Sequence, residues 1–302
     1  RVRLAARALS GVGFFRLRAE LHPLEIEPGM KQKTWLITGC SRGLGRAIAE
    51  AALEAGQRVI ATARDASVIA DLEKPGMCEV MTLDVTDQAQ ARDVVAASKP
   101  DVIVNNAGQG LLGAVEECGE EQIRRCMETN FHGPLNVIRA ALPGLRSRRS
   151  GHIINISAAA AISNYAGFGI YGAAKGALEM LSESLRLELA PLGIHVTLVQ
   201  PGPFRTAFIS RSLEKAEHEI GDYAASSGKF ARLIEGMDGR QPGDPARAAR
   251  AIMAAASSDK PPMRLVLGRY ANEKARRRGA EVEKERAEWE AVGSPCEFTS
   301  PA

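Results

Sequence analysis

The chain has 302 residues, of which 45% are hydrophobic and 25% carry a charge. This composition excludes intrinsic disorder, collagen and coiled-coil rods, and no stretch approaches the roughly 18 consecutive apolar residues of a membrane span. The net charge of +3 gives little support to nucleic-acid binding. Five cysteines without paired spacing predict neither a disulfide framework nor a zinc site, and they favour a reducing, cytoplasmic compartment.

The first residues of the chain are basic, with no acid before Glu20. Two interpretations are open for residues 1–29. They are upstream translation ahead of a natural start at Met30, or they are a transit segment that would make the protein organellar. We favour the first, which leaves residues 30–302 as a single domain.

Short apolar runs alternate with longer helical patterns along the chain. The runs are bounded by turn residues and several are nearly continuous in Val and Ile, which is typical of strands buried on both faces. We expect strands at Thr34–Thr38, Arg58–Thr62, Glu79–Leu83, Val102–Val104, His152–Ser157, His195–Val199 and Arg264–Leu267. We expect helices at Leu44–Ala55, Asp87–Ala97, Glu120–Leu142, Tyr171–Leu192, Pro245–Ala256 and Asn272–Glu290.

This alternation predicts an α/β fold, a doubly wound Rossmann-type parallel sheet of about seven strands flanked by helices. A barrel would need eight such units with similar loops. The long insertion at residues 204–243 is predicted to be a substrate lid, because it carries many apolar side chains. The alternative, equally open, is that these side chains only pack the insertion back on the domain. Residues 270–302 are predicted to form a mixed-charge surface helix and tail.

A glycine-rich segment joins the first predicted strand to the first helix. Its glycines permit a tight turn and a close approach to a pyrophosphate, and the following helix N-terminus offers free N–H groups. The spacing Gly-x-x-x-Gly-x-Gly differs from the more familiar Gly-x-Gly-x-x-Gly. The segment is therefore predicted to bind a nucleotide through Gly39, Ser41, Arg42, Gly43, Leu44 and Gly45.

The end of the second strand indicates which nucleotide binds. An acid there would bind a ribose 2′-hydroxyl, but the strand ends at Ala63 followed by Arg64. A second arginine, Arg42, lies in the glycine loop. Two guanidinium groups near one phosphate favour NADP(H) over NAD(H). The alternative is that Arg64 only pairs with a surface carboxylate such as Asp65.

Tyr171 and Lys175 are four residues apart in a predicted helix and therefore share one face. A free tyrosine has a pKa near about 10, and a neighbouring cation favours its phenolate and lowers that pKa. Tyr165 is an internal control, because the residue four positions later is Gly169.

Ser157 ends a strand fourteen positions before Tyr171, where its hydroxyl is expected to point to a substrate oxygen. Asn130 lies in the predicted helix Glu120–Leu142. Asn106, Ala107 and Gly108 close the fourth strand, where small residues permit close approach of a cofactor.

These motifs, in this order and spacing, resemble the short-chain dehydrogenase/reductase superfamily in its single-domain form: TGxxxGxG, NNAG, Asn130, Ser157, YxxxK and Pro201-Gly202. The resemblance covers about residues 33–267. Within the superfamily the chain looks like bacterial NADP-preferring oxidoreductases similar to retinol and 17β-hydroxysteroid dehydrogenases.

The resemblance implies a role for each matching residue. Tyr171 would be the acid/base, Lys175 would lower its pKa and hold the nicotinamide ribose, and Ser157 would polarise the substrate oxygen. Asn130 would support a proton relay through Lys175. Further cofactor contacts would come from Asp84, Val85, Asn106, Ala107, Gly108, Pro201, Gly202 and Thr206. Relatives often pair through the helices Glu120–Leu142 and Tyr171–Leu192, which implies a homodimer or homotetramer.

The sequence thus predicts an NADP(H)-dependent enzyme that interconverts a carbonyl and a hydroxyl group on a small hydrophobic substrate, without a metal. Two alternatives stay open: a non-catalytic NADP-binding sensor or scaffold, and an enzyme like the nucleotide-sugar epimerases or dehydratases. Further pocket-wall candidates are Leu111, Leu112, Ser163 and Tyr165. Cys40, in the glycine loop, is interpreted as a small filler rather than a nucleophile.

Overall fold

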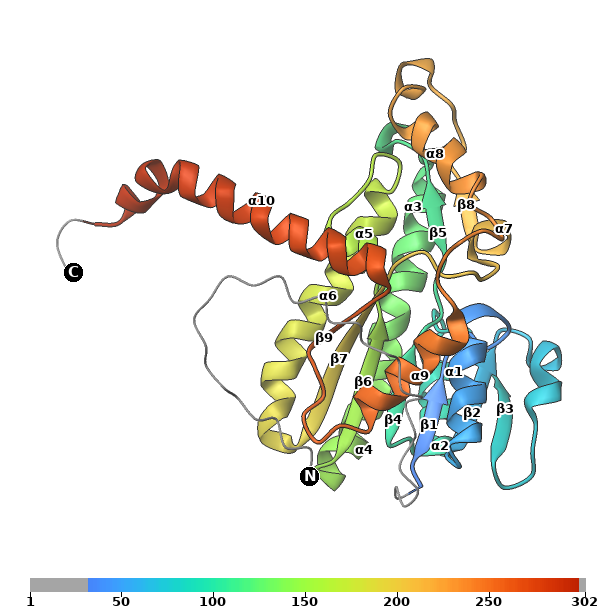
Figure 1. Cartoon of the computed structure of the whole chain (residues 1–302). Helices are drawn as coiled ribbons and strands as arrows, with labels where there is room; N and C mark the ends of the chain where they lie inside the picture. The colour runs from blue at the N-terminus through green and yellow to red at the C-terminus, as the bar shows by residue number, and fades with distance from the viewer. Residues whose placement is uncertain (1–31, 299–302) are drawn as a thin grey trace, which may run out of the picture.

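A seven-stranded parallel sheet forms the centre of the molecule (Figure 1). The computed structural model describes residues 32–298, so the interpretation of residues 1–29 lies outside the described part of the chain. The strand order is β3-β2-β1-β4-β6-β7-β9. Their bounds are β1 Thr34–Ile37, β2 Arg58–Ala63, β3 Cys78–Thr82, β4 Val102–Asn105, β6 Gly151–Ile156, β7 Ile194–Pro201 and β9 Arg264–Leu267. All seven expected strands are present, and the predicted doubly wound α/β fold is confirmed.

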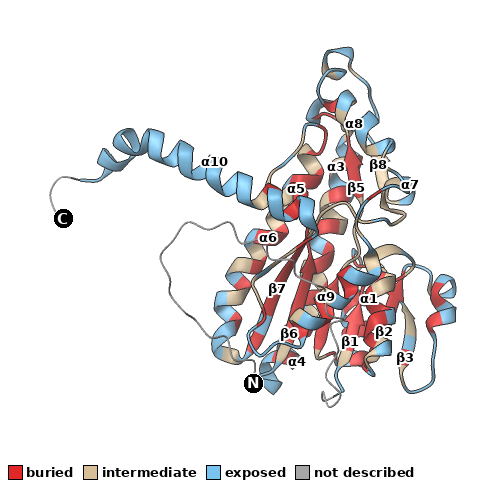
Figure 2. Cartoon of the chain, in the orientation of Figure 1, coloured by how far each residue is buried: buried red, intermediate tan, exposed pale blue. Residues whose placement is uncertain are grey.

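Helices cover both faces of this sheet, because successive strand residues point to opposite sides. Ile37 faces helices α1 (Gly43–Glu54) and α9 (Pro245–Ala256), whereas Leu36 faces α2 (Gln88–Ser98), α4 (Gly133–Arg148) and α6 (Gly169–Leu189). The five inner strands are buried almost throughout, as Figure 2 shows in red, whereas the edge strands β3 and β9 are only partly buried. Near-continuous apolar strands are therefore explained by two covered faces.

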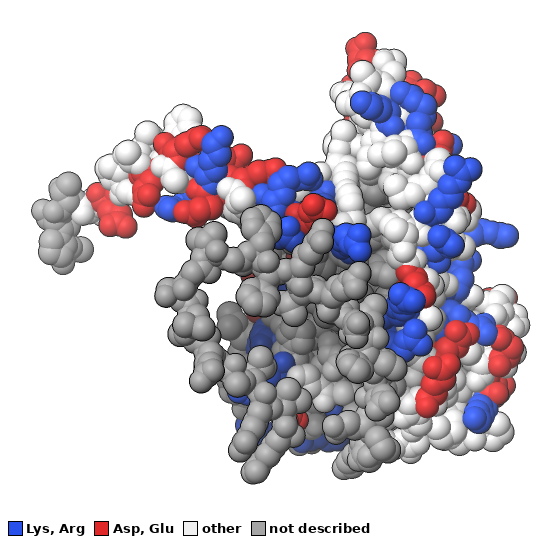
Figure 3. All heavy atoms as spheres, in the orientation of Figure 1, with Lys and Arg blue, Asp and Glu red and all other residues white. Residues whose placement is uncertain are grey.

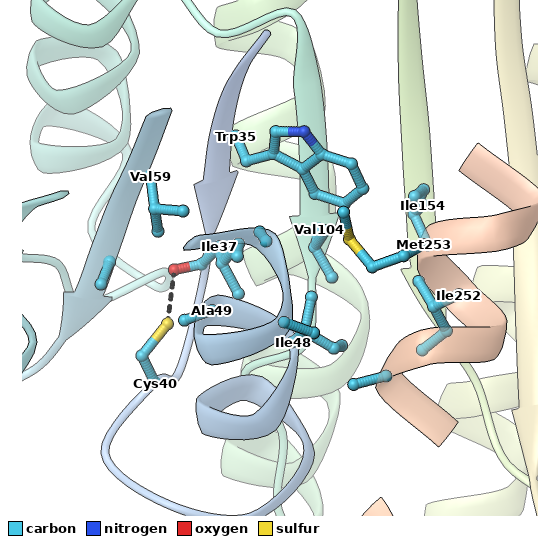
Figure 4. Packing of buried hydrophobic residues seen from close by; sticks show 14 of the residues in the cluster. Trp35, Ile37, Cys40, Ile48, Ala49, Val59, Val104, Ile154, Ile252 and Met253 are labelled. Atoms are coloured by element: carbon cyan, nitrogen blue, oxygen red, sulfur yellow. Dashed lines mark hydrogen bonds between the residues drawn. The ribbon is translucent and has the colours of Figure 1, made fainter. Parts of the chain in front are cut away.

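Figure 4 shows the packing on the first of these faces, where Trp35 and Ile37 meet Ile48, Ile252 and Met253. Cys40 belongs to this core. Its thiol is fully buried and lies 3.2 Å from the carbonyl oxygen of Ile37. Burial raises the pKa of the Cys40 thiol to about 12, so the residue is a protonated filler at neutral pH.

The expected helix Glu120–Leu142 is interrupted in the structure. Helix α3 covers Glu120–Met127, a π-helical turn covers Glu128–His132, and α4 follows. Pro134 has no N–H to donate to the carbonyl four residues earlier, and the Gly133 N–H bonds instead to Glu128, five residues back. The sequence pattern was read as one helix because both parts keep the same apolar period.

The segment between β7 and α9 contains small elements that the sequence analysis missed. A second sheet pairs β5 (Gly110–Leu112) with β8 (Leu213–Lys215) in parallel. Each strand has three residues, too few for a period-two pattern to show. Two helices, α7 (Phe208–Arg211) and α8 (Ser227–Glu235), complete this region. The other short helices are α5 (Ala159–Ile162) and the 3-10 helix Ala66–Leu72. Single 3-10 turns lie at Val115–Glu117, Ala190–Leu192, Gly221–Tyr223 and Ser294–Cys296.

The last helix, α10 (Arg269–Gly293), projects from the body and is exposed along most of its length (Figures 1 and 2). Charges of both signs alternate along it (Figure 3). Several form ion pairs one turn apart, such as Arg277 with Glu281 and Arg286 with Glu290. Such pairs stabilise a helix with little tertiary contact. Among residues 32–298, no helix is both long enough and apolar enough to cross a membrane.

Candidate active site

A cavity of about 1250 Å³ opens at the carboxyl ends of the sheet strands, below the segment that carries α7 and α8. Every residue that the sequence predicts to be catalytic or to bind the cofactor lines this cavity, except Gly45. The lining members are Gly39, Ser41, Arg42, Gly43, Leu44, Arg64, Asp84, Val85, Asn106, Ala107, Gly108, Asn130, Ser157, Tyr171, Lys175, Pro201, Gly202 and Thr206. The fold therefore brings together residues that lie far apart in the sequence.

The glycine loop has the backbone that a phosphate cradle requires. Gly39 and Gly43 have φ angles of 72° and 64°, in the left-handed region that favours glycine. A Cβ on Gly45 would lie 2.3 Å from the Asn106 amide nitrogen, so Gly45 permits close packing behind the loop. Helix α1 begins at Gly43, and its first N–H groups have no partner within the helix. These features fit a bound pyrophosphate.

Asn106 joins the glycine loop to the end of β4. Its side-chain amide donates to the carbonyl oxygens of Thr38 and Gly39, at 2.9 and 3.1 Å. The Thr38 hydroxyl accepts in return from the backbone N–H groups of Asn106 and Ala107. The two motifs, which the sequence analysis treated separately, are therefore one hydrogen-bonded unit.

The two arginines at this end are exposed and line the cavity. Arg42 donates to the Arg211 carbonyl and to the Ser212 hydroxyl, both at 3.3 Å. Arg64 forms no ion pair within the described residues, and the carboxylate of Asp65 accepts from Ser67 instead. The alternative in which Arg64 pairs with Asp65 is not what the structure shows.

Tyr171 and Lys175 lie one turn apart on α6 and are both buried, with 7% and 4% of their surfaces exposed. The Lys175 ammonium donates to the Ile156 carbonyl oxygen at 2.9 Å. Burial lowers the pKa of Lys175 to about 8. Burial also raises the pKa of Tyr171 above its ordinary value, followed by a smaller contribution from Cys126. Loss of water thus shifts the pKa of Tyr171 in the direction opposite to the effect expected from a neighbouring cation.

Asn130 lies in the π-helical turn, and both hydrogens of its side-chain amide are donated to backbone carbonyl groups. It donates to the Gln109 and Cys126 carbonyl oxygens at 2.7 and 2.9 Å. The Asn130 side-chain oxygen is buried and has no partner. A Cβ on Gly108 would lie 2.8 Å from this oxygen and 3.4 Å from the Lys175 nitrogen. An unpaired acceptor and an ammonium thus flank one small space, which suits a bridging water or hydroxyl group.

Ser157 does not point its hydroxyl into the cavity as the sequence analysis expected. The hydroxyl is buried and donates to the Glu179 carboxylate at 2.5 Å. Glu179 also accepts from the Gln200 side chain at 2.9 and 3.0 Å. The orientation follows from strand alternation, which directs Ser157 toward α6.

Aromatic rings form the wall of the cavity beside Tyr171. Tyr165 stacks on Phe230 with centroids 4.8 Å apart, and Phe168 meets both Tyr171 and Phe230 edge to face. Of the apolar residues in the predicted lid, those that line the cavity are Phe204, Phe208, Ile209, Leu213, Phe230, Leu233, Ile234 and Met237.

Some candidates for the pocket wall were wrong. Leu111, Leu112 and Ser163 do not line this cavity; the two leucines belong to β5 and are buried in the cluster that contains Phe168 and Tyr171. Ile220 and Tyr223 of the predicted lid are also absent from its wall.

Two residues of α10 that no sequence motif marks contact Tyr165 of this wall. The Tyr270 hydroxyl lies 2.8 Å from that of Tyr165, and Tyr270 lines the cavity. The Lys274 ammonium lies 3.2 Å from the centre of the Tyr165 ring. Lys274 was part of a charge run interpreted as a solvated surface, and nothing local in the sequence marks it as buried.

The glycine cradle lies at one end of the cavity, and the unpaired Asn130 oxygen lies with Tyr171 and Lys175 at the other, an arrangement that fits a bound nucleotide beside titratable groups. The sequence model of the family described as short chain dehydrogenase matches residues 33–217. The chain belongs to this family of oxidoreductases, which bind a nicotinamide cofactor.

Individual relatives agree with this assignment. The chain is 36% identical to a 3-ketodihydrosphingosine reductase of Bacteroides thetaiotaomicron over 245 residues, which covers 79% of this chain and 89% of the relative. It is 35% identical to human 17-beta-hydroxysteroid dehydrogenase type 1 over 205 residues, 63% of this chain and 62% of that protein. The crystal structure of a short-chain dehydrogenase from Streptomyces avermitilis superimposes with a TM-score of 0.82 at 41% identity, covering 88% of this chain and 99% of that one.

Proposed function

We propose that this protein is an NADP(H)-dependent oxidoreductase that interconverts a carbonyl and a hydroxyl group on a small hydrophobic substrate. The observation that carries the proposal is the buried pair Tyr171 and Lys175, which lies in a cavity with an aromatic wall on one side and a glycine cradle on the other. Burial strengthens electrostatic interactions within such a site and excludes water from the reaction.

Different residues of the cavity would bind different parts of the cofactor. The glycine loop would hold the pyrophosphate, Asp84 and Val85 the adenine, and Lys175 the nicotinamide ribose. Pro201, Gly202 and Thr206 would flank the nicotinamide. A Cβ on Gly43 would lie 3.2 Å from the Thr206 side chain, so the start of the lid rests on the glycine loop.

Tyr171 is the proposed acid/base. Its raised pKa keeps the phenol protonated at neutral pH, which suits a group that donates a proton to the oxygen of a carbonyl undergoing reduction. The bound nicotinamide would supply the hydride. Lys175 keeps a positive charge beside the phenolate that remains, and Asn130 offers its free oxygen to a water that returns the proton.

A spectroscopic assay tests the proposal. Purified protein is mixed with NADPH and a panel of apolar ketones, aldehydes and nucleotide sugars, and the near-ultraviolet absorbance of NADPH is followed. We expect turnover of apolar carbonyl compounds. Tight NADPH binding without turnover of any compound would instead support the sensor or scaffold alternative. An epimerase or dehydratase consumes no net NADPH, so the nucleotide sugars are also analysed by chromatography of the products, and their conversion without loss of NADPH absorbance would support the epimerase-like alternative.

The preference for NADP(H) rests on Arg42 and Arg64, which present two guanidinium groups at the same end of the cavity. A charge-assisted contact to the 2′-phosphate contributes about 1.5–3 kcal/mol. Arg64→Ala is therefore expected to weaken NADPH binding by roughly 10–100-fold, with NADH binding unchanged. Titration of intrinsic fluorescence with both cofactors measures this, and an equal loss for NADH would contradict the 2′-phosphate assignment.

Self-association and location are further parts of the proposal. Met180 and Leu187 are exposed one heptad apart on α6, which supports a homodimer or homotetramer formed through this helix. Light scattering after gel filtration, with Leu187→Glu as the variant, tests the association. All five cysteines lie within residues 32–298 and are free thiols, which supports the proposed cytoplasmic location.

A further inference from the structure

Two successive inward-facing side chains at the end of β6 point to the same helix. The Asn155 amide donates to the Ser182 hydroxyl at 2.8 Å, and the Ser157 hydroxyl donates to Glu179. The two donors are two residues apart along the chain, and their acceptors on α6 are three residues apart. Ser157 continues a row of polar contacts that holds the sheet to the helix.

Glu179 is the centre of the second contact. Only 5% of its surface is exposed, and its two oxygens accept from Ser157 and from the Gln200 amide. A buried carboxylate is costly unless its oxygens are satisfied, so these donors are required by the fold. Eight residues of helix separate Glu179 from Tyr171, which is about 12 Å along the axis.

The next residue, Ala158, has extended backbone and therefore directs its side chain to the other side from Ser157. Ala158 belongs to the same buried cluster as Phe168 and Tyr171, and it lines the cavity. At the place where the end of β6 meets the Tyr171 cluster, the chain therefore presents a methyl group and no hydroxyl.

Lys175 and Glu179, one turn apart on α6, hold two consecutive residues of the β6 end. Lys175 donates to the Ile156 carbonyl oxygen at 2.9 Å, and Glu179 accepts from the Ser157 hydroxyl. A change in the second contact is transmitted to the first through a single peptide unit. The Ser157–Glu179–Gln200 network is thus placed to fix the position of Lys175 relative to Tyr171.

We propose that Ser157, Glu179 and Gln200 are positioning residues that hold the end of β6 against α6, and that Tyr171 alone donates a side-chain hydrogen bond to the substrate oxygen, beside the methyl group of Ala158. This inference rests on the proposed carbonyl chemistry. It corrects the expectation that Ser157 polarises the substrate, and it assigns Glu179 and Gln200 a role that the motifs do not reveal.

The kinetic test compares Ser157→Ala, Ala158→Ser and the double variant with the wild-type enzyme on one active carbonyl substrate. Loss of a direct donor to the reacting oxygen costs roughly 10²–10³-fold in kcat. We expect Ser157→Ala to lower kcat by less than about tenfold, well below that range. Ala158→Ser adds a hydroxyl on the Tyr171 side and is expected to raise kcat in both backgrounds. A loss of a hundredfold or more in Ser157→Ala, without rescue in the double variant, would overturn the proposal.

The pH dependence separates positioning from a merely structural role. Lys175 is faced by Tyr171 and Glu179 from its own helix, by Cys126 from α3 and by Asn130 from the π-helical turn, and the charge of Glu179 raises the Lys175 pKa. Glu179→Gln keeps the shape but removes that charge. It is therefore expected to move the alkaline limb of the kcat profile to lower pH, whereas Ser157→Ala leaves this limb in place. An unmoved limb in Glu179→Gln would count against the proposal.

A measurement without substrate distinguishes failure of this inference from failure of the proposed function. Urea unfolding of Ser157→Ala, Glu179→Gln and the double variant forms a thermodynamic cycle. If the two side chains are in contact, the changes in the urea midpoint of the single variants will not add up to that of the double variant. Additive changes would contradict the contact, even where turnover is normal. NADPH binding in each variant reports whether the cleft is intact. If the wild-type protein binds NADPH but reduces no compound, the proposed function fails. The thermodynamic cycle still shows whether Ser157 and Glu179 are in contact.

Discussion

Two tyrosines of the cavity wall, Tyr171 and Tyr165, each have a lysine neighbour, and the chain brings the two pairs together in different ways. Tyr171 and Lys175 are neighbours on one helix, and the ammonium bonds to a backbone carbonyl beside the phenol. Tyr165 and Lys274 come from distant parts of the chain, and the second ammonium lies against the ring face. Both lysines are almost fully buried, and burial lowers the pKa of each to about 8.

Burial and a nearby cation therefore do not by themselves distinguish a reactive tyrosine from a structural one. The surroundings differ: Lys175 lies beside Gly108 and the free oxygen of Asn130, whereas the Tyr165 hydroxyl already bonds to Tyr270. The phenol of Tyr171 has no such partner among the described residues. An available hydroxyl next to the cofactor cradle is what separates the two pairs.

Exchange of each tyrosine for phenylalanine tests this separation most directly. Tyr171→Phe removes the proposed acid/base and is expected to lower kcat by roughly 10³-fold, with NADPH binding retained. Tyr165→Phe keeps the ring beneath Lys274 and is expected to change kcat only slightly. Steady-state kinetics of both variants on one substrate provide the comparison. Similar losses in the two variants would show that the pairs are not functionally distinct.

Exchange of each lysine is expected to have the next largest effect. Lys175→Met removes the charge beside the phenolate and should lower kcat by roughly 10²-fold, because electrostatic stabilisation in a dry site is strong. Lys274→Met should act on KM by loosening the aromatic wall, with kcat little changed. Separate determination of kcat and KM checks both. A fall in kcat for Lys274→Met as large as that for Lys175→Met would remove the distinction.

The pH profile of reduction gives a smaller, graded effect. Lys175 has a pKa of about 8, lowered from 10.5 by burial, so its charge is present at neutral pH and is lost as the pH rises through that value. We expect kcat for reduction to fall above about pH 8. Lys274 titrates in the same range, so Lys274→Met is the control that should leave the profile unchanged.

The smallest expected effect concerns the hydroxyl pair on the aromatic wall. Tyr270→Phe removes one hydrogen bond at a partly exposed position, 44% open to solvent. Its expected cost in unfolding free energy is about 0.5 kcal/mol, at the low end for a hydrogen bond. Chemical denaturation measures it, and Tyr171→Phe, whose hydroxyl is unpaired in the structure, is the matched control.

Local sequence patterns made most of the candidate cofactor site predictable. Each of these patterns is short in sequence: the glycine loop, the Tyr171–Lys175 pair and the small residues after β4. The parallel sheet then brings them together, because its strands end at the same edge. Asn130 was also placed correctly in the cavity, although the π-helical turn that presents it was not foreseen.

What sequence reasoning missed depends on contacts between distant segments or on side-chain direction. Lys274 and Tyr270 reach the wall only because α10 packs beside α5. Ser157 was assigned to the cavity from its position at a strand end, but strand alternation turned its hydroxyl to Glu179. Short strands such as β5 leave no periodic signal at all.

The position of α10 has a consequence for how this enzyme could be altered. The residues proposed to carry hydride and proton transfer end at Thr206, whereas one corner of the aromatic wall arrives with Tyr270 and Lys274 in the final helix. The same helix also supports the proposed cofactor end, because a Cβ on Gly202 would lie 3.5 Å from the Ala271 side chain. Exchange of Tyr270 and Lys274 would thus reshape one corner of the aromatic wall, whereas Ala271 has to be kept for the proposed nicotinamide contact at Gly202.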